Sequence, residues 1–315
     1  MNILITGAAG NLGSHLARYL VDSEHNLRLM VHRRPPPPDL VGQNNVTVHQ
    51  VDLGRPDTLP AACAGVDCIV HLAGILFQPR PERFLQLTNV VYTQNLLAAA
   101  SEAGVRKFTL ISFPHVEGDS SVERPATGRM DGQPDSVHAQ TRLQAERELL
   151  ATAAQSGMTP VILRSGMIYG RGVLMVDAFR RLARYKILAV WPGPTWIHLI
   201  SLPDFLAATK AAIESDTAEG VYNVGDDLPL TFQEFLDRAA AHWGYWRPWR
   251  LPGWSFYVAA TAVETFASIF RTSSPLTRDF IRIGMASNVA DTTRMRQELL
   301  PELAYPTLNE GIGLL

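Results

Sequence analysis

Apolar residues in the first half of the chain recur in short strand-like runs that alternate with helix-like stretches. The predicted strands cover residues 2–6, 26–32, 46–51, 68–74, 108–112 and 159–164, and the predicted helices cover 15–21, 56–62, 88–103 and 136–155. Strands and helices that alternate at this spacing are typical of a parallel sheet with helices on both faces. The sequence therefore predicts an α/β fold built on a Rossmann-type, doubly wound parallel sheet.

Three glycines follow the first predicted strand and precede a helical pattern. Gly7 would form the turn, Gly10 would let the backbone approach a phosphate, and Gly13 would let the helix pack closely on the strand. This arrangement places a dinucleotide pyrophosphate on a helix N-terminus, where free N–H groups point at it. The predicted phosphate-binding residues are Gly7, Gly10, Asn11, Leu12 and Gly13.

The regular alternation ends after Gly166. Residues 173–186 and 232–242 are predicted helices, and 197–201 and 221–224 are predicted short strands. No internal repeat or low-complexity linker separates the two parts, so the second is expected to pack on the first. We expect an NAD(P)-binding domain over residues 1–165 and a smaller C-terminal α/β substrate lobe over 166–315, with strand segments that return to the main sheet.

The second predicted strand ends in His32-Arg33-Arg34 and carries no acidic residue. An acid at this point would bind the ribose 2′-hydroxyl of NAD, whereas arginine suits the 2′-phosphate of NADP. Arg33 and Arg34 therefore favour NADP(H) over NAD(H). The alternative is a solvated basic loop ahead of the four prolines at 35–38.

Other cofactor contacts are expected where the remaining strands end. Asp52 and Leu53 would lie beside the adenine, although Asp52 has an equal alternative as the cap of the helix at 56–62. The fourth predicted strand ends in Leu72, Ala73 and Gly74, and the sixth is followed by Ser165. In open α/β sheets, ligands bind outside these carboxyl ends.

Composition narrows the possible partners. The 315 residues are 46% hydrophobic and 18% charged, with a net charge of −2, which gives no global field for nucleic acid. The two cysteines are not spaced like a zinc or redox pair, and no metal site is predicted. A strand that starts at Asn2 leaves no room for a signal peptide, and no run of about 18 apolar residues indicates a membrane span. We expect a cytoplasmic protein with a small-molecule substrate.

Five segments together resemble the extended short-chain dehydrogenase/reductase superfamily. They are Thr6-Gly-Ala-Ala-Gly-Asn-Leu-Gly13, His71-Leu-Ala-Gly74, Asn89-Val-Val, Arg164-Ser-Gly-Met-Ile-Tyr-Gly170 and Tyr222-Asn-Val-Gly225. Each is weak alone, but their order and spacing match the family over nearly the whole chain. The superfamily includes sugar-nucleotide epimerases, dehydratases and hydroxysteroid dehydrogenases.

The resemblance implies a catalytic serine and a Tyr-x-x-x-Lys pair on the helix after the polar loop. Here that helix has His138 in place of the tyrosine and Arg142 in place of the lysine. The serine position falls at or next to Phe113, with Ser112 one residue short. The catalytic candidates are therefore His138, Arg142 and Ser112, in a site that departs from the family pattern at all three positions.

Two interpretations of this site remain open. In the first, His138 exchanges a proton with substrate, Arg142 holds the ribose, and Ser112, His115 or Tyr169 adds a hydrogen bond. In the second, the protein binds the nucleotide without turnover, as a scaffold or redox sensor. This second interpretation follows a resemblance to the NADPH-binding accessory subunit of respiratory complex I and to the nitrogen-regulator branch. A sugar-nucleotide epimerase or dehydratase is a further alternative.

An aromatic-rich stretch over residues 243–270 bears on the substrate. It contains Trp243, Trp246, Trp249, Trp254, Phe256, Tyr257, Phe266 and Phe270. These side chains could contact a lipophilic substrate, form the core of the small lobe, or belong to an interfacial helix over 254–270 that touches a membrane or a partner. The core interpretation is favoured, and the scarcity of cations in this stretch argues against anionic lipid.

The leading hypothesis is an NADP(H)-dependent oxidoreductase that acts on a small, apolar carbonyl or hydroxyl compound. The resemblance also implies a homodimer, formed through the helices at 88–103 and 137–154.

Overall fold

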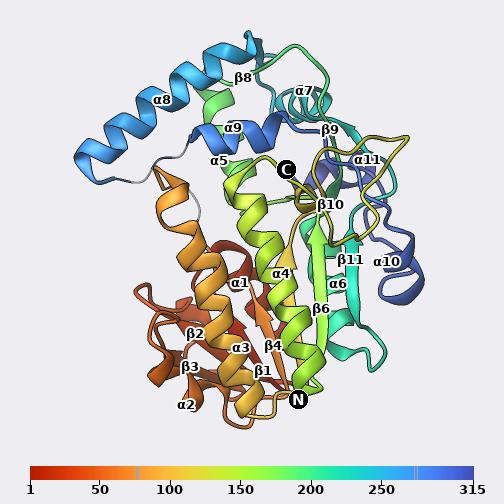
Figure 1. Ribbon diagram of the computed structural model, residues 1–315. Helices are drawn as coiled ribbons and strands as arrows, with labels where there is room; N and C mark the ends of the chain where they lie inside the picture. The colour runs from red at the N-terminus through yellow and green to blue at the C-terminus, as the bar shows by residue number, and fades with distance from the viewer. Residues whose placement is uncertain (76–77, 273, 275) are drawn as a thin grey trace.

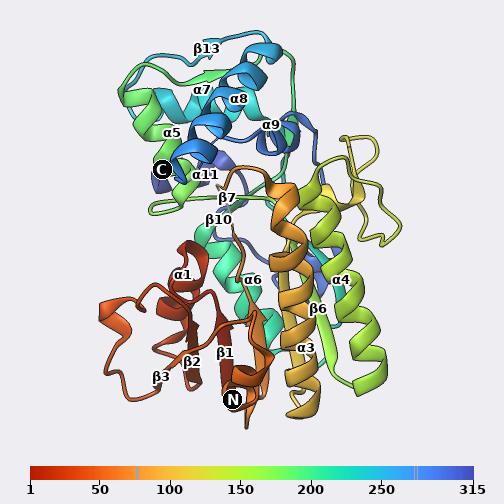
Figure 2. The ribbon, with the colours of Figure 1, turned by 60° about the vertical axis from the view of Figure 1, so that its left-hand side comes forward.

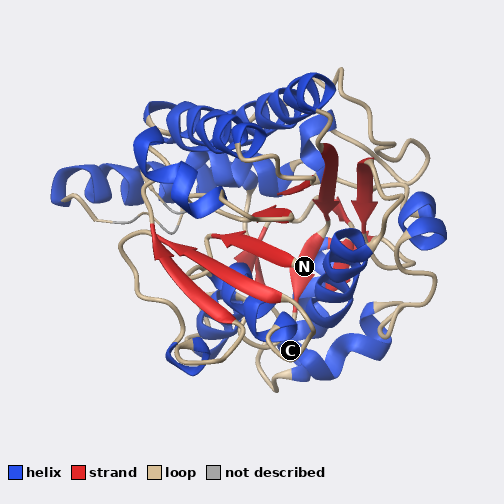
Figure 3. Ribbon diagram, turned by 90° about the horizontal axis from the view of Figure 1, so that it is seen from below, coloured by secondary structure: helices blue, strands red, loops and turns tan. Residues whose placement is uncertain are grey.

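Seven parallel strands form the central sheet of the computed structural model, which describes residues 1–75, 78–272, 274 and 276–315. They are β1 (Asn2–Thr6), β2 (Asn26–Val31), β3 (Val46–Gln50), β4 (Cys68–His71), β5 (Lys107–Ser112), β6 (Thr159–Ser165) and β11 (Gly220–Val224). Within these described residues the strand order is β11-β6-β5-β4-β1-β2-β3, and Figure 3 shows helices on both faces. The predicted doubly wound fold is confirmed.

The direction of strand addition reverses between β1 and β4. The chain runs from β1 outward to β3, then crosses back to β4, which pairs with the other side of β1. Thr6 lies opposite His71 where these two strands end. In an open α/β sheet this reversal opens a crevice at the carboxyl ends, which is where ligands bind.

Five helices cover the sheet in two layers (Figure 2). They are α1 (Asn11–Leu20) and α6 (Leu202–Glu214) on one face, and α2 (Leu59–Cys63), α3 (Tyr92–Glu102) and α4 (Val137–Ser156) on the other. Alternate strand residues point to opposite faces, so Ile3 and Ile5 pack with the first pair of helices and Leu4 packs with the other three. The two faces thus form separate apolar cores around one sheet.

Apart from α10 (Thr293–Glu298), which lies beside the edge strand β11, the remaining elements build a lobe over the carboxyl ends of the strands (Figures 1 and 2). The strands are β7 (Met167–Tyr169), β8 (Ala189–Val190), β9 (Trp196–Ile197), β10 (Leu199–Ser201), β12 (Leu230–Thr231) and β13 (Trp249–Arg250). The helices are α5 (Leu174–Arg184), α7 (Phe232–His242), α8 (Gly253–Phe270), α9 (Arg278–Met285) and α11 (Leu308–Gly311). These strands pair only two at a time, as β7–β10, β8–β13 and β9–β12, so the lobe adds no second large sheet to the described fold.

The predicted elements differ from the observed ones mainly at their ends. The first helix begins earlier than expected, at Asn11, and the fourth strand ends at His71, because residues 72–74 leave the sheet for the crevice. A 3₁₀ turn (Pro56–Thr58) precedes α2, and a π-helical turn (Gln86–Val91) precedes α3. As expected, the strand predicted at 221–224 returns to the main sheet as β11.

The aromatic stretch does not form the core of the lobe, so that interpretation is wrong for most of its side chains. Trp246, Trp249, Trp254, Phe266 and Phe270 are exposed to solvent. Among the aromatics of α8, Phe256 packs inward, with its ring 5.6 Å from that of Trp191. The core of the lobe is instead supplied by aliphatic residues and by rings from earlier in the chain, such as Trp191 and Phe235.

Asp226 is a fully buried carboxyl group two residues after the end of β11, and neither of its side-chain oxygens has a hydrogen-bond partner among the described residues. His198 Nε2 lies 3.7 Å from Asp226 Oδ1, but the ring carries no charge that could neutralise an ionised carboxyl group. The Nε2–H of His198 donates to the Asp226 carbonyl at 2.7 Å, and its Nδ1 accepts from the Ala290 amide, which leaves a neutral ring. Burial, and secondarily Asp227, raises the pKa of Asp226 to about 8.

We expect Asp226→Asn to stabilise the protein increasingly as the pH rises from about 4 to about 8. A carboxyl whose folded pKa is about 8, against an ordinary value of 3.8, favours folding only while it is protonated, so its contribution is lost across this interval. Thermal unfolding across this pH range measures the effect, with the exposed Asp216→Asn as the control. Equal shifts for the two variants would contradict the prediction.

Candidate functional site

The glycine turn brings β1, α1 and the end of β4 within backbone contact of one another. Gly7 adopts a φ of +68°, and the Gly10 amide donates to its carbonyl at 2.7 Å. A Cβ on Gly7 would lie 2.9 Å from the Ala73 nitrogen, and one on Gly13 would overlap the Gly7 carbonyl oxygen. The first and third glycines therefore have the roles that the sequence predicts for them.

The first turn of α1 is left open for an anion. Its N-cap, Gly10, has no side chain to accept hydrogen bonds from the helix amides. The Asn11 side chain turns to the lobe instead, where it donates to the Gly172 carbonyl at 2.7 Å and accepts from the Leu174 amide at 2.9 Å. Leu12 packs against the core. These two residues can therefore offer a phosphate only their backbone amides.

A hydrogen-bonded chain fixes the crevice between β1 and β4. The Ala73 amide donates to Thr6 Oγ1, which lies 2.8 Å from His71 Nδ1, while His71 Nε2 lies 3.2 Å from Thr93 Oγ1. Because the Thr93 hydroxyl donates to the Asn89 carbonyl, it accepts from His71 Nε2–H. Burial, with a smaller contribution from Arg142, lowers the pKa of His71 to about 3. His71 is thus a neutral structural bridge.

Arg142 is the least satisfied polar side chain of the crevice. It is buried, its Nε and Nη1 have no hydrogen-bond partner among the described residues, and its Nη2 would lie 3.2 Å from a Cβ on Gly74. Burial lowers the pKa of Arg142 to about 10, which still leaves it charged at neutral pH. A buried cation with free donors is costly, and these donors are available to a ligand in the crevice.

His138 lies one helical turn before Arg142 on the same face of α4. Its ring centroid is 5.2 Å from that of Phe113, which in turn is 5.4 Å from that of His115. Burial, then the Arg142 and His115 charges, lowers the pKa of His138 to about 3. The imidazole is therefore neutral at physiological pH, with one N–H to donate and one lone pair to accept.

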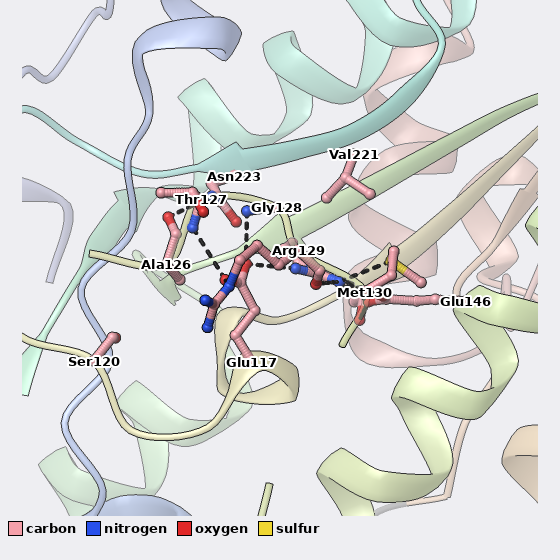
Figure 4. A network of polar contacts seen from close by, with 12 residues as sticks. Glu117, Ser120, Ala126, Thr127, Gly128, Arg129, Met130, Glu146, Val221 and Asn223 are labelled. Atoms are coloured by element: carbon pink, nitrogen blue, oxygen red, sulfur yellow. Dashed lines mark hydrogen bonds and ion pairs between the residues drawn. The ribbon is translucent and has the colours of Figure 1, made fainter. Parts of the chain in front are cut away.

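Ser112 is committed to a buried ion network instead of facing outward. Its hydroxyl donates to Glu146, which also accepts from Arg164 Nη2 at 2.6 Å. Arg164 Nη1 lies 2.6 Å from Glu117, and Glu117 in turn accepts from the Thr127 and Gly128 amides (Figure 4). The network fastens the polar loop between β5 and α4 to the sheet, so Ser112 acts here as a structural residue.

The residues that position His138 come from distant parts of the chain. Asp279 of α9 accepts from the Val137 amide at 2.9 Å and from the His138 amide at 3.3 Å, which satisfies the start of α4. Asn288 Nδ2 lies 3.2 Å from His115 Nε2. Nothing local in the sequence points to Asp279 or Asn288. Glu146, by contrast, follows Arg142 by four residues, and that spacing could have indicated a shared helix face.

The other sequence-predicted residues lie at different edges of the crevice. Arg33 and Arg34 are exposed after β2 and make no ion pair or side-chain hydrogen bond within the described residues. Asp52 does not cap the helix at 56–62, because its Oδ1 accepts from the Gly54 amide in a tight turn and its Oδ2 lies 3.6 Å from His32 Nε2. The Leu53 carbonyl is held by Asn95.

Two further candidates have their hydroxyl groups in other contacts. The Ser165 hydroxyl donates to the neighbouring Gly166 carbonyl. Tyr169 is fully buried with its hydroxyl against Gly311, in surroundings that include Asp204 and Asp226. The structure therefore brings together His138, Arg142 and Gly74, with His115 nearby.

An open helix N-terminus behind a glycine turn, at the reversal point of a parallel sheet, is the arrangement of Rossmann-type folds, in which dinucleotides bind at this point. Residues 3–225 match the model of the NAD dependent epimerase/dehydratase family. The chain belongs to this family, in which an NAD(P) cofactor is typical.

Characterised relatives and solved structures cover most of the chain. The 3β-hydroxysteroid dehydrogenase/Δ5→4-isomerase of Mycobacterium tuberculosis is 27% identical over 290 residues, which is 80% of this chain and 75% of the relative. The ceramide reductase of Caulobacter vibrioides is 28% identical over 280 residues, 86% of this chain and 80% of the relative. The UDP-glucose 4-epimerase of Thermus thermophilus, solved with NAD, superposes with a TM-score of 0.76 at 21% identity and covers 100% of this chain and 97% of its own.

A membrane span is not part of the described fold. Among the helices formed by residues 1–75, 78–272, 274 and 276–315, none has both the length and the hydropathy to cross a bilayer.

We expect Gly13→Ala to disrupt the turn and abolish nucleotide binding, because its Cβ would collide with the Gly7 backbone, which has no flexible side chain to move aside. Isothermal titration with NADPH and a thermal melt measure the two effects. Gly193→Ala is the matched control, since a Cβ there meets nothing within 4 Å and needs no positive φ. Full NADPH affinity in Gly13→Ala would refute the assignment of this turn.

Proposed function

We propose that the protein is an NADP(H)-dependent oxidoreductase that acts on a small apolar carbonyl or hydroxyl compound. The observation that carries the proposal is the buried guanidinium of Arg142, which lies next to Gly74. Its Nε and Nη1 have no hydrogen-bond partner among the described residues. This position corresponds to the lysine that holds the nicotinamide ribose in the family pattern. The free donors of Arg142 are suited to hydroxyl groups, because a guanidinium can donate along two directions at once.

Different residues of the crevice would bind different parts of the cofactor. The amides of Asn11, Leu12 and Gly13 would bind the pyrophosphate, and Leu72, Ala73 and Gly74 would line the path between it and Arg142. When bound, the nicotinamide supplies or accepts a hydride. His138, neutral because of its lowered pKa, would donate a hydrogen bond to a carbonyl oxygen or accept one from a hydroxyl.

The two arginines after β2 support the choice of NADP(H). Arg33 and Arg34 are exposed and without ion pairs in the described structure, so neither is already neutralised. No carboxylate follows β2 directly, and the nearby Asp52 is engaged by Gly54 and His32. A guanidinium that is free in the unliganded protein can take a 2′-phosphate bidentately without first breaking another contact.

The apolar substrate class is supported by the walls around His138 and by the relatives. Phe113 packs against the His138 ring. The two relatives described above are named for a steroid and for a ceramide, both lipophilic compounds with hydroxyl or carbonyl groups. The likeness to the UDP-glucose epimerase supports the fold only.

Catalytic silence is the second candidate function, and two observations favour it. A His138 with a pKa of about 3 is a poor proton donor at neutral pH, and the Ser112 hydroxyl is already bound to Glu146. The protein would then bind NADP(H) as a scaffold or redox sensor.

We expect Arg33→Ala to weaken NADPH binding by about tenfold to a hundredfold, because a charge-assisted hydrogen bond contributes roughly 1.5–3 kcal/mol. NADH binding should be unchanged, since NADH lacks the 2′-phosphate. Titration calorimetry with both cofactors measures this, and Arg55→Ala, an exposed arginine paired with Asp57, serves as the control. An equal loss for NADPH and NADH would contradict the phosphate assignment.

Substitutions at His138 and Arg142 distinguish the hypothesis of an enzyme from that of a protein that binds NADP(H) without turnover. With NADPH and a panel of apolar ketones, His138→Phe should lower turnover by about a hundredfold or more, the usual contribution of a positioned acid–base group. The double variant His138→Tyr/Arg142→Lys, which restores the tyrosine and lysine of the family pattern, should retain or raise the turnover. Arg142→Met should weaken NADPH binding in either case. Tight NADPH binding without turnover in the wild type and in the restored variant would establish the silent binder.

A further inference from the structure

The lobe carries a set of exposed apolar side chains that no described element covers. It comprises Tyr185, Ile187, Trp246, Trp249, Leu251, Trp254, Val258, Phe266, Ile269 and Phe270, each at least 41% exposed. We call this set the α8 surface. Soluble proteins rarely expose so many large apolar side chains side by side unless the surface meets another phase or molecule.

Helix α8 supplies most of this surface and projects from the body of the protein (Figure 1). Trp254, Val258 and Ile269 fall on the same side of the helix at 100° per residue. The only charged residue between Gly253 and Phe270 is Glu264, which is buried and bonded to the Arg278 backbone amide and Nε. The exposed side of α8 is therefore free of charge along its whole length of 18 residues.

Cations adjoin the tryptophan end of the surface. Lys186 Nζ lies 5.6 Å from the Trp246 ring, and the Trp249 indole donates to the Lys186 carbonyl. The pairing of β8 with β13 holds these two segments together. Just before Lys186, α5 presents the exposed Arg180, Arg181 and Arg184, none of which is in an ion pair within the described residues. Helix α8 itself lacks cations, but its neighbours provide them.

We propose that the α8 surface docks the protein on an anionic lipid bilayer, with α8 lying in the plane of the headgroups. Tryptophan and tyrosine side chains prefer the depth of the headgroups, and aliphatic and phenyl groups the acyl boundary just below. The unpaired arginines of α5 match the negative charge of such a membrane. A second copy of this chain would bring the same arginines close to one another, which disfavours a symmetric protein interface.

The docking surface is mechanically joined to the catalytic helix. Glu264 of α8 holds Arg278, and the adjacent Asp279 of α9 binds the first amides of α4 just before the His138 side chain. If the proposed function holds, these contacts connect the membrane-facing helix to the helix that carries His138. The supply of a lipophilic substrate from the membrane rests on the proposed function, whereas the docking on lipid does not.

Flotation of the full chain with vesicles tests the docking without cofactor or substrate. The wild type should float with phosphatidylcholine vesicles that contain roughly one third phosphatidylglycerol, and less with phosphatidylcholine alone. Trp254→Ser/Phe266→Ser/Ile269→Ser should lower partition to both by about a hundredfold. Arg180→Gln/Arg181→Gln/Arg184→Gln should lower partition to the anionic vesicles by about a hundredfold and leave the neutral ones unchanged.

Matched controls lie at the other end of the molecule. Tyr19→Ser/Val48→Ser removes exposed apolar side chains from α1 and β3, and Arg55→Gln/Arg106→Gln removes exposed cations. Neither should alter flotation, and thermal melts verify that all variants fold. Failure of the wild type to float would overturn the proposal. So would a sedimentation dimer that the α8 variant converts to monomer without any vesicle binding, since the occupant would then be a second copy.

Discussion

The backbone contact between Gly13 and Gly7 sets the distance at which α1 packs on the sheet, and much of the site depends on that distance. Because no Cβ intervenes, the first turn of α1 sits directly behind the turn, and the Gly7 backbone in turn touches Ala73. Asn11 then reaches the lobe segment at Gly172. One steric constraint thereby fixes three parts of the molecule around a common crevice: the helix N-terminus, the end of β4 and the edge of the lobe.

Two buried arginines, Arg164 and Arg142, differ in whether the fold supplies partners for their charge. Arg164 is fully buried and balanced by two carboxylates, Glu117 and Glu146, so its cost of desolvation is offset within the protein. Arg142 is also buried, but two of its nitrogens have no partner in the described residues. An unbalanced charge of this kind destabilises the empty protein and favours any anionic or hydroxylated ligand that completes it. The guanidinium of Arg164 is paired within the fold, whereas that of Arg142 keeps free donors toward the crevice.

The lobe completes the site by contacts that span more than a hundred residues of sequence. Asp279 binds the start of α4, and Asn288 Nδ2 lies 3.2 Å from His115 Nε2. The surroundings of His138 therefore depend on the packing of the lobe against the sheet domain. The same α9 segment is bonded to α8 through Glu264 and Arg278. The exposed apolar helix and the His138 imidazole are thus parts of one connected unit.

The sequence by itself determined the sheet, its helices and the glycine turn, because these follow from local periodicity and from backbone sterics at three glycines. It also placed His138 and Arg142 on one helix face, a consequence of four-residue spacing alone. Only the tertiary structure decided that Ser112 is bound to Glu146, that the pKa of His138 is strongly lowered, and that most of the aromatics at 243–270 face solvent. Hydrogen-bond partners, burial and the electrostatic surroundings of a side chain depend on residues brought together across the fold, and no local pattern encodes them.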